Sequence, residues 1–230
     1  MISPKRKALI LFLGIVVVCS SVDAQVGELR QNISIGFNGG VNLNSVIFSP
    51  RIKQSQMTGF NGGLTARFIS EKYFAMICGL QMELNYSERG WKEQVEDETG
   101  DTYNRSMNYV EIPFLAHLAF GNDDGAQFFL NLGPQASLLL NEQENKSPSW
   151  HPEQRRVSEQ YDKPADSKFD YGLAFGAGLE VKTKAGNFLI EGRYYYGLAD
   201  FYNNSKKDYF GRSAHTVISG KITYLFDLKK

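Results

Sequence analysis

The chain has 230 residues with 25 basic and 25 acidic side chains, so its net charge is zero when the histidines are neutral. Nucleic-acid-binding proteins need a clear basic excess, and this balance argues against that class. Of its two cysteines, Cys19 and Cys78, the first lies in a segment expected to be removed. We therefore expect neither a disulfide nor a cysteine metal cluster.

The first 24 residues have the pattern of a cleaved secretory signal peptide. Residues 5–7 are basic, and residues 8–18 form an apolar run that is too short for a membrane-spanning helix, which needs about 20 residues. Residues 22–24 end on an alanine where signal peptidase would cut, which makes Gln25 the expected mature start. An uncleaved anchor and lipid modification of Cys19 are less favoured alternatives.

Residues 25–230 are expected to form a single domain, which retains 22 basic and 24 acidic residues. Apolar and polar residues alternate in eight segments of this domain: about 31–42, 57–69, 73–88, 105–120, 127–140, 169–183, 187–199 and 214–228. Successive side chains of a β-strand face opposite sides, so this period of two predicts strands. A helix would mix Glu83 with Leu80 and Leu84 on one face.

The connections between these segments alternate in length. The short ones cover residues 70–72, 121–125 and 184–186, and the long polar ones cover 43–56, 89–104, 141–168 and 200–213. Outer-membrane barrels have short periplasmic turns and longer extracellular loops. The pattern therefore predicts an all-β, eight-stranded antiparallel up-and-down transmembrane β-barrel in a Gram-negative outer membrane. Both termini are expected in the periplasm and the long loops outside the cell.

The composition of the polar row indicates which face points inward. This row is rich in Gly, Ser, Asn and Thr and carries scattered charges of both signs. The charged members are Arg67, Glu83, Glu111, Glu180, Lys182, Glu191, Arg193 and Lys221. An eight-stranded barrel has an interior just wide enough to be filled by side chains, and charges buried there must be paired. We expect these eight residues to form a structural network in the lumen; a proton or ion path is the alternative.

Two further features concern the strands. Aromatic residues at strand ends indicate interfacial girdles, although aromatic residues are also good strand formers. They are Tyr73, Phe74, Tyr86, Trp91, Tyr103, Tyr109, Phe120, Tyr171, Phe188, Tyr224 and Phe226.

Pro113 lies inside a strand of a sheet expected to have no edge, so we expect a bulge or a local bend there.

The motifs of the chain together resemble a known family. The sequence is similar to the PorT-like outer-membrane β-barrel proteins, sometimes called the porin family, over nearly all of the mature chain. The similar segments are residues 35–40, 59–63, 109–114, 133–134, 175–178 and 193–198. The resemblance implies an eight-stranded barrel in the outer membrane, and it adds a protein-secretion apparatus as a possible partner.

We expect no enzymatic activity and no catalytic, cofactor-binding or metal-binding residues. His117, His151 and His215 fall in different parts of the predicted barrel, and no nucleophile motif or His-Glu-x-x-His pattern is present. The longest loop, 141–168, is a candidate for binding a partner or lipopolysaccharide phosphates. It contains Trp150, His151, Arg155, Arg156 and Tyr161. The alternative is an ordinary solvated loop.

The expected function is therefore that of a structural or interaction protein, or of an accessory to secretion. A small passive pore is the first alternative, and a soluble lipocalin-like binding barrel or an outer-membrane enzyme is less favoured. The expected partners are outer-membrane lipid and the barrel-assembly machinery, which reads an aromatic last strand such as Tyr224-Leu225-Phe226.

Overall fold

The computed structural model describes residues 27–95, 100–123 and 125–229, and the expected signal segment lies outside them. The strands are β1 (Glu28–Ser49), β2 (Gln54–Ser55), β3 (Met57–Tyr73), β4 (Met76–Glu93), β5 (Tyr103–Gly121), β6 (Ala126–Lys146), β7 (Phe169–Thr183), β8 (Gly186–Gly197) and β9 (Arg212–Lys229). One 3-10 turn, η1, covers Pro152–Gln154. Among the described residues, no helix has the length and apolar character needed to cross a membrane.

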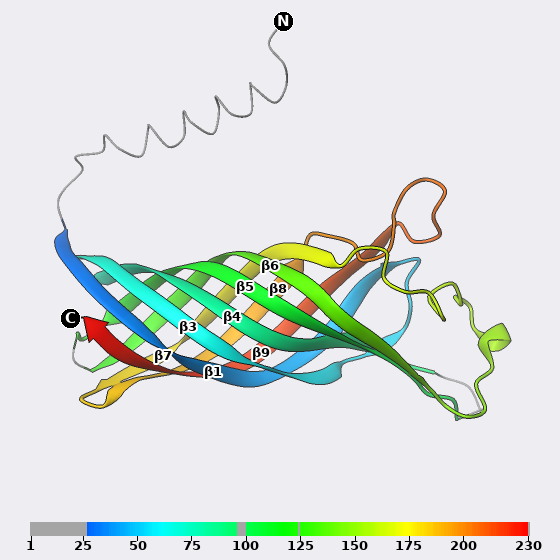
Figure 1. Ribbon diagram of the computed structural model, residues 1–230, viewed down its shortest axis with the longest axis horizontal. Coiled ribbons are helices and arrows are strands. Elements are labelled where there is room, and N and C mark those ends of the chain that lie inside the picture. The colour runs from blue at the N-terminus through cyan, green and yellow to red at the C-terminus, as the bar shows by residue number, and fades with distance from the viewer. Residues whose placement is uncertain (1–26, 96–99, 124, 230) are drawn as a thin grey trace, which may run out of the picture.

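Eight long strands close into an antiparallel barrel (Figure 1). Around the barrel the order is β4, β3, β1, β9, β8, β7, β6 and β5, and β5 pairs back onto β4. The first and last strands are joined over their length, from Ser34 opposite Asp227 to Ser49 opposite Arg212. The two-residue strand β2 pairs only with the end of β4. The eight-stranded antiparallel barrel expected from the alternation is confirmed.

The two ends of the barrel differ, as Figure 1 shows. The tight connections β3–β4, β5–β6 and β7–β8 lie at what we call the turn end, together with both ends of the described chain. The long connections lie at the opposite, loop end. One expected turn was misplaced: β3 continues to Tyr73, which pairs with Met76, so the first hairpin turns at Phe74-Ala75 and not at residues 70–72.

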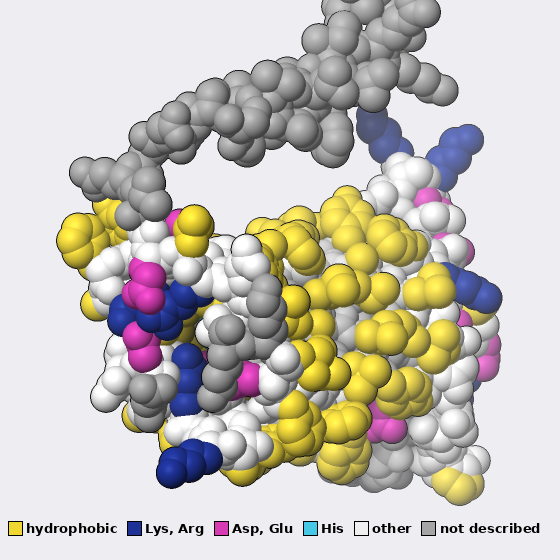
Figure 2. All heavy atoms as spheres, turned by 60° about the vertical axis from the view of Figure 1, so that its left-hand side comes forward, with side chains coloured by type: hydrophobic (Ala, Val, Ile, Leu, Met, Phe, Trp, Pro, Cys, Tyr) yellow, Lys and Arg dark blue, Asp and Glu magenta, His cyan; other side chains and the backbone are white. Residues whose placement is uncertain are grey.

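A broad apolar band surrounds the wall of the barrel. The outward row of β6, for example, holds Phe128, Leu130, Leu132 and Leu138, whose side chains are about half exposed. Figure 2 shows hydrophobic side chains spread across the wall, with charged groups gathered beyond them on both sides in that view. Such a band suits a hydrocarbon environment, since a soluble protein rarely exposes a continuous apolar surface of this extent.

Towards the loop end the two faces of the strands exchange character: the outward row becomes polar and the inward row becomes apolar. On β4 the outward residues become polar at Glu88 and Lys92, while the inward row changes from Glu83 to Trp91. The ends of β5 and β6 behave in the same way, with Tyr103 and Met107 inside. This loop-end section has an apolar core and a polar surface, as a soluble barrel does. It explains why β4, β5 and β6 extend beyond the predicted strands.

The loop-end section also corrects part of the predicted aromatic girdle. Trp91, Tyr103 and Tyr109 are fully buried inside the barrel and cannot contact lipid. Phe74, Tyr86, Phe120, Tyr171, Phe188 and Phe226 are exposed as expected. The error arose because a period of two only assigns each residue to one of the two faces of a strand. It does not show the point along the strand where apolar residues stop facing lipid and start facing the interior of the barrel.

Pro113 does not produce the expected bulge. Met82 pairs with Phe114 and Asn85 with Glu111, so the register between β4 and β5 is the same on both sides of the proline. The shift in this region lies between Asn108 and Tyr109, opposite β6. The side chain of Pro113 is buried in the lumen. The strand therefore accommodates the proline by omitting ladder pairs and not by inserting a residue.

We predict that a charge in the middle of the apolar band destabilises the barrel strongly. Leu132→Arg places a guanidinium on the outward face of β6 and is expected to lower the free energy of unfolding in lipid vesicles by roughly 2–4 kcal/mol. Gln143→Arg, outward on the same strand in the loop-end section, is the matched control and should change it little. If urea-unfolding titrations show equal losses of unfolding free energy for the two variants, the outward row of β6 does not face lipid.

Candidate functional site

The lumen is crossed by ion pairs between strands on opposite sides of the barrel. In the middle cluster, Arg193 of β8 makes two hydrogen bonds to Glu83 of β4, at 2.9 and 2.7 Å. Arg193 also binds Glu191 on its own strand, at 2.8 and 2.9 Å, and Lys221 of β9 donates to Glu83 at 2.6 Å. These two cations and two carboxylates balance one another, as buried charges require.

Polar side chains complete the coordination of Glu83. Gln81 and Asn85 donate to its two carboxylate oxygens at 2.7 and 2.8 Å. Gly176 of β7 provides the space for Glu191, because a Cβ atom there would lie 1.9 Å from a carboxylate oxygen of Glu191. The glycine in the inward row of β7 is therefore required by the packing of the charges.

A second pair, the turn-side cluster, lies nearer the turn end. Arg67 of β3 binds Glu180 of β7 through two hydrogen bonds of 2.6 and 2.7 Å. The Nε2 atom of His117 lies 3.4 Å from Arg67, and its Nδ1 atom lies 2.8 Å from the amide oxygen of Asn131. All four side chains are almost fully buried. β3 and β7 face each other across the barrel, so this pair also bridges the whole lumen.

The loop-side cluster is built on Arg89, a residue that the sequence analysis assigned to a loop. Its guanidinium binds Glu111 at 2.7 Å, Asp170 at 2.6 Å and Ser137 at 2.9 Å, and so connects β4 with β5, β6 and β7. The rings of Tyr109 and Tyr195 lie 4.7 and 4.5 Å from it. Ser87, Arg89 and Trp91 continue the inward row of this strand beyond its predicted end. That continued alternation was the signal from which Arg89 could have been predicted to lie in the lumen.

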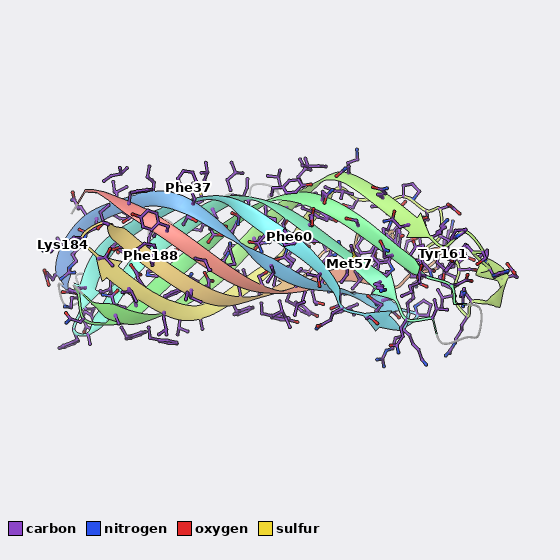
Figure 3. All side chains as sticks on the ribbon, turned by 90° about the horizontal axis from the view of Figure 1, so that it is seen from below. Phe37, Met57, Phe60, Tyr161, Lys184 and Phe188 are labelled. Carbon is purple, nitrogen blue, oxygen red and sulfur yellow. The ribbon has the colours of Figure 1, made fainter. Side chains whose placement is uncertain are left out.

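Seven of the eight predicted lumen charges thus fall into three clusters, and Lys182 is separate. It lines a cavity of about 610 Å³ at the turn end, together with Arg30, Asp123, Lys184 and Asp227. Asp123 accepts hydrogen bonds from Arg30 at 2.8 Å and Lys72 at 2.7 Å, which lower the pKa of its carboxyl to about 2. The Lys182 ammonium has no ion-pair partner among the residues that the structure describes. Figure 3 places Lys184 at this end and Tyr161 at the loop end.

Little space is left between the middle cluster and the loop-side cluster. The cavity between the middle and loop-side clusters, bordered by Arg89 and Arg193, has a volume of about 20 Å³. This is enough for about one water molecule. Between these two clusters, side chains therefore fill the lumen.

An aromatic cluster closes the loop end above these charges. It consists of Phe48, Trp91, Tyr103, Phe201, Tyr202 and Phe210. Trp91 stacks on Phe201 with ring centroids 5.6 Å apart, and Tyr202 stacks on Phe210 at 5.1 Å. Arg105 lies beside Trp91 and Tyr202 and forms ion pairs with Glu142 and Glu144, both at 3.2 Å. The connection 198–211 is thereby folded back into the barrel.

The residues singled out in the longest loop also have defined places. Arg155 pairs with Asp101 at 2.6 Å and lies 5.0 Å from the Trp150 ring. Tyr161 donates a hydrogen bond to Glu93 at 2.7 Å. Burial raises the pKa of the Glu93 carboxyl, and the hydrogen bonds it accepts act in the opposite direction. This loop is therefore packed onto the loop-end section.

The three histidines lie apart, as expected. His117 belongs to the turn-side cluster, His215 is 3.1 Å from the Tyr109 hydroxyl, and His151 is 3.3 Å from Asp101. Among residues 27–95, 100–123 and 125–229, no group of three or more His, Cys, Asp or Glu side chains has the geometry of a metal site.

Comparison with known families agrees with this architecture. The model of the outer membrane protein beta-barrel domain matches residues 24–203. The chain belongs to this family. It is an outer-membrane β-barrel protein, and the soluble lipocalin-like alternative is excluded. The match identifies the outer membrane protein beta-barrel domain and does not assign the chain to the PorT-like group suggested by the sequence motifs.

Solved structures with a similar fold are outer-membrane proteins with low sequence identity. The attachment invasion locus protein Ail of Yersinia pestis is 14% identical, with 86% of this chain and 100% of that chain covered and a TM-score of 0.38. Neisserial surface protein A is 13% identical, with 84% and 97% covered and a TM-score of 0.42. OprG of Pseudomonas aeruginosa is 12% identical, with 87% and 98% covered and a TM-score of 0.43. None of the curated proteins matches the chain.

We predict that the middle cluster is energetically coupled. Arg193→Met leaves Glu83 and Glu191 with only Lys221 as a counter-charge and should lower the free energy of unfolding by about 3–5 kcal/mol. Glu83→Gln combined with Arg193→Met keeps the remaining charges balanced and should recover part of this loss. A double-mutant cycle measured by urea unfolding tests the coupling. If the losses of unfolding free energy in the two single variants simply add up in the double variant, the Glu83–Arg193 pair makes no specific contribution to stability.

Proposed function

We propose that this protein is a non-conducting outer-membrane barrel whose loop end faces outside the cell and serves as an interaction surface. The observation that carries the proposal is the set of ion pairs joining β4 to β8 and β3 to β7 across the lumen. Small barrels of eight strands have interiors that side chains can fill. The filled lumen disfavours the passive pore, and the separated histidines disfavour an enzyme.

The proposed orientation rests on the difference between the two ends. Short turns face the periplasm and long connections face outward in outer-membrane barrels. Here the long connections are anchored on the aromatic cluster and on the loop-end section, so they form a preorganised surface. A preorganised surface loses less conformational entropy when it binds a partner.

A planar-bilayer experiment tests the closed lumen. The purified protein should give no reproducible unitary current steps, whereas a porin inserted into the same membrane provides the positive control. Trp91→Ala combined with Phe201→Ala removes part of the aromatic cluster and should leave the membrane non-conducting, because the charge clusters below remain intact. Stable, well-resolved channels from the unaltered protein would refute the proposal in favour of the pore.

The resemblance to PorT-like proteins supports a narrower version of this function, that of an accessory to protein secretion. Photo-crosslinkers placed at exposed residues of each end in native membranes test it. Lys184 at the turn end and Lys207 in the connection 198–211 are suitable positions. We expect a secretion component to be captured from one end only. Crosslinks confined to lipid at both positions would contradict the secretion role while leaving the closed barrel unaffected.

A further inference from the structure

Three separate connections meet in one pocket at the loop end. Its volume is about 310 Å³, at the lower end of the range of about 300–1,000 Å³ for small-molecule sites. Residues 51–53 come from the β1–β2 connection, residues 93–95 from the end of β4, and residues 155–161 from the longest loop. The pocket lies beyond the apolar band, where the strands carry polar outward residues.

The walls of the pocket are held by the fold. The amide of Gln94 donates to the carbonyl of Lys53 at 3.0 Å, and the Gln54 side chain binds both backbone polar groups of Val46. On the other side, Tyr161 and Gln160 donate to the two carboxylate oxygens of Glu93 at 2.7 and 2.8 Å. A site with fixed walls requires little reorganisation when a ligand binds.

Most of the charged residues in the described lining are cations. Arg51, Lys53, Arg155 and Arg156 surround the pocket, and Glu93 is its one described acidic residue. Arg155 is oriented by Asp101, at 2.6 Å. Arg51 and Arg156 are exposed and have no ion-pair partner within the described part of the chain. Guanidinium groups bind phosphate and sulfate in a forked geometry, so the two exposed arginines suit such a group.

The other lining residues suit a sugar ring. Val157 and Ile52 are buried apolar residues in the wall, and the ring of Tyr161 is partly exposed beside them. The carboxylate of Glu93 and the amide of Gln94 can hydrogen-bond hydroxyl groups. Apolar and aromatic walls with a few fixed polar groups are typical of ligand sites.

We propose that this pocket binds an anionic saccharide, with a phosphate or sulfate group between Arg51 and Arg156 and a sugar ring against Tyr161 and Val157. This inference rests on the proposed function, because it assigns a ligand class to the loop-end surface. The same chemistry exists in two sources: the phosphorylated sugars of lipopolysaccharide in the surrounding membrane, and free acidic polysaccharides.

Binding of labelled dextran-sulfate oligosaccharides to the full protein in phosphatidylcholine nanodiscs tests the proposal. The unsulfated oligosaccharide should bind much more weakly. Arg51→Ala with Arg156→Ala should weaken binding of the sulfated probe at least about tenfold. Lys206→Ala with Lys207→Ala removes the same charge from exposed positions in the connection 198–211 and should change it by less than about twofold.

Several results would overturn the inference. Equal losses in the two double variants would show attraction by general charge and no defined site. An oligoglutamate peptide of the same charge that binds as tightly as the sulfated probe would exclude saccharide recognition.

A folding control accompanies these measurements: unchanged heat-modifiable gel migration of each variant shows that the barrel is folded. Since the current measurement tests the closed lumen separately, either proposal can fail without the other.

The source of the ligand is determined by a second type of nanodisc. When lipopolysaccharide replaces part of the phospholipid, a pocket that binds neighbouring lipopolysaccharide is already occupied, and the sulfated probe should lose affinity about tenfold or more. An unchanged affinity assigns the site to free polysaccharide. In both cases Arg51→Lys with Arg156→Lys should bind less tightly than the unaltered protein, because lysine keeps the charge but lacks the fork.

Discussion

Inside a membrane every backbone N–H and C=O group must be paired within the protein, and the pairing of β1 with β9 meets this requirement by leaving the sheet without an edge. Closure of only eight strands makes the lumen narrow. The inward row consists of polar and charged side chains, so charges from opposite strands come within hydrogen-bond distance. Arg193 with Glu83 and Arg67 with Glu180 are the direct result, and both pairs cross the lumen.

The same strands serve two environments along their length. On β4, Leu84 and Tyr86 face outward in the apolar band, whereas Glu88 and Lys92 face outward beyond it; inside, Glu83 gives way to Trp91. This exchange produces a barrel section with a hydrophobic core above the membrane section. The long connections pack on that core, and they therefore present a defined surface and pocket. The ion pairs across the lumen and the packed loop end are the basis of the proposed role in recognition.

Much of this architecture could be predicted from residue patterns. The strand at 169–183 was placed with its correct ends. Seven of the eight charged residues expected inside are buried in the structure: Arg67, Glu83, Glu111, Glu180, Glu191, Arg193 and Lys221. Arg89 was missed because polar outward neighbours made the end of β4 look like a loop. Of the two alternatives expected at Pro113, a bulge or a local bend, the bulge is absent from the described β4–β5 ladder, because that ladder tolerates a missing donor without a change of register.

Alternation, even strand number and the mixed-charge inner row could be read from the sequence because each depends on local backbone geometry or on the chemistry of single residues. The partners of the charges could not. Glu83 and Arg193 are 110 positions apart, and their contact depends on the stagger of all the strands between them as the sheet closes. The separation of Lys182 from the clusters was likewise decided only by the tertiary structure, and so was the presence of Arg51 and Arg156 in the lining of one pocket. Each depends on how distant segments are brought together.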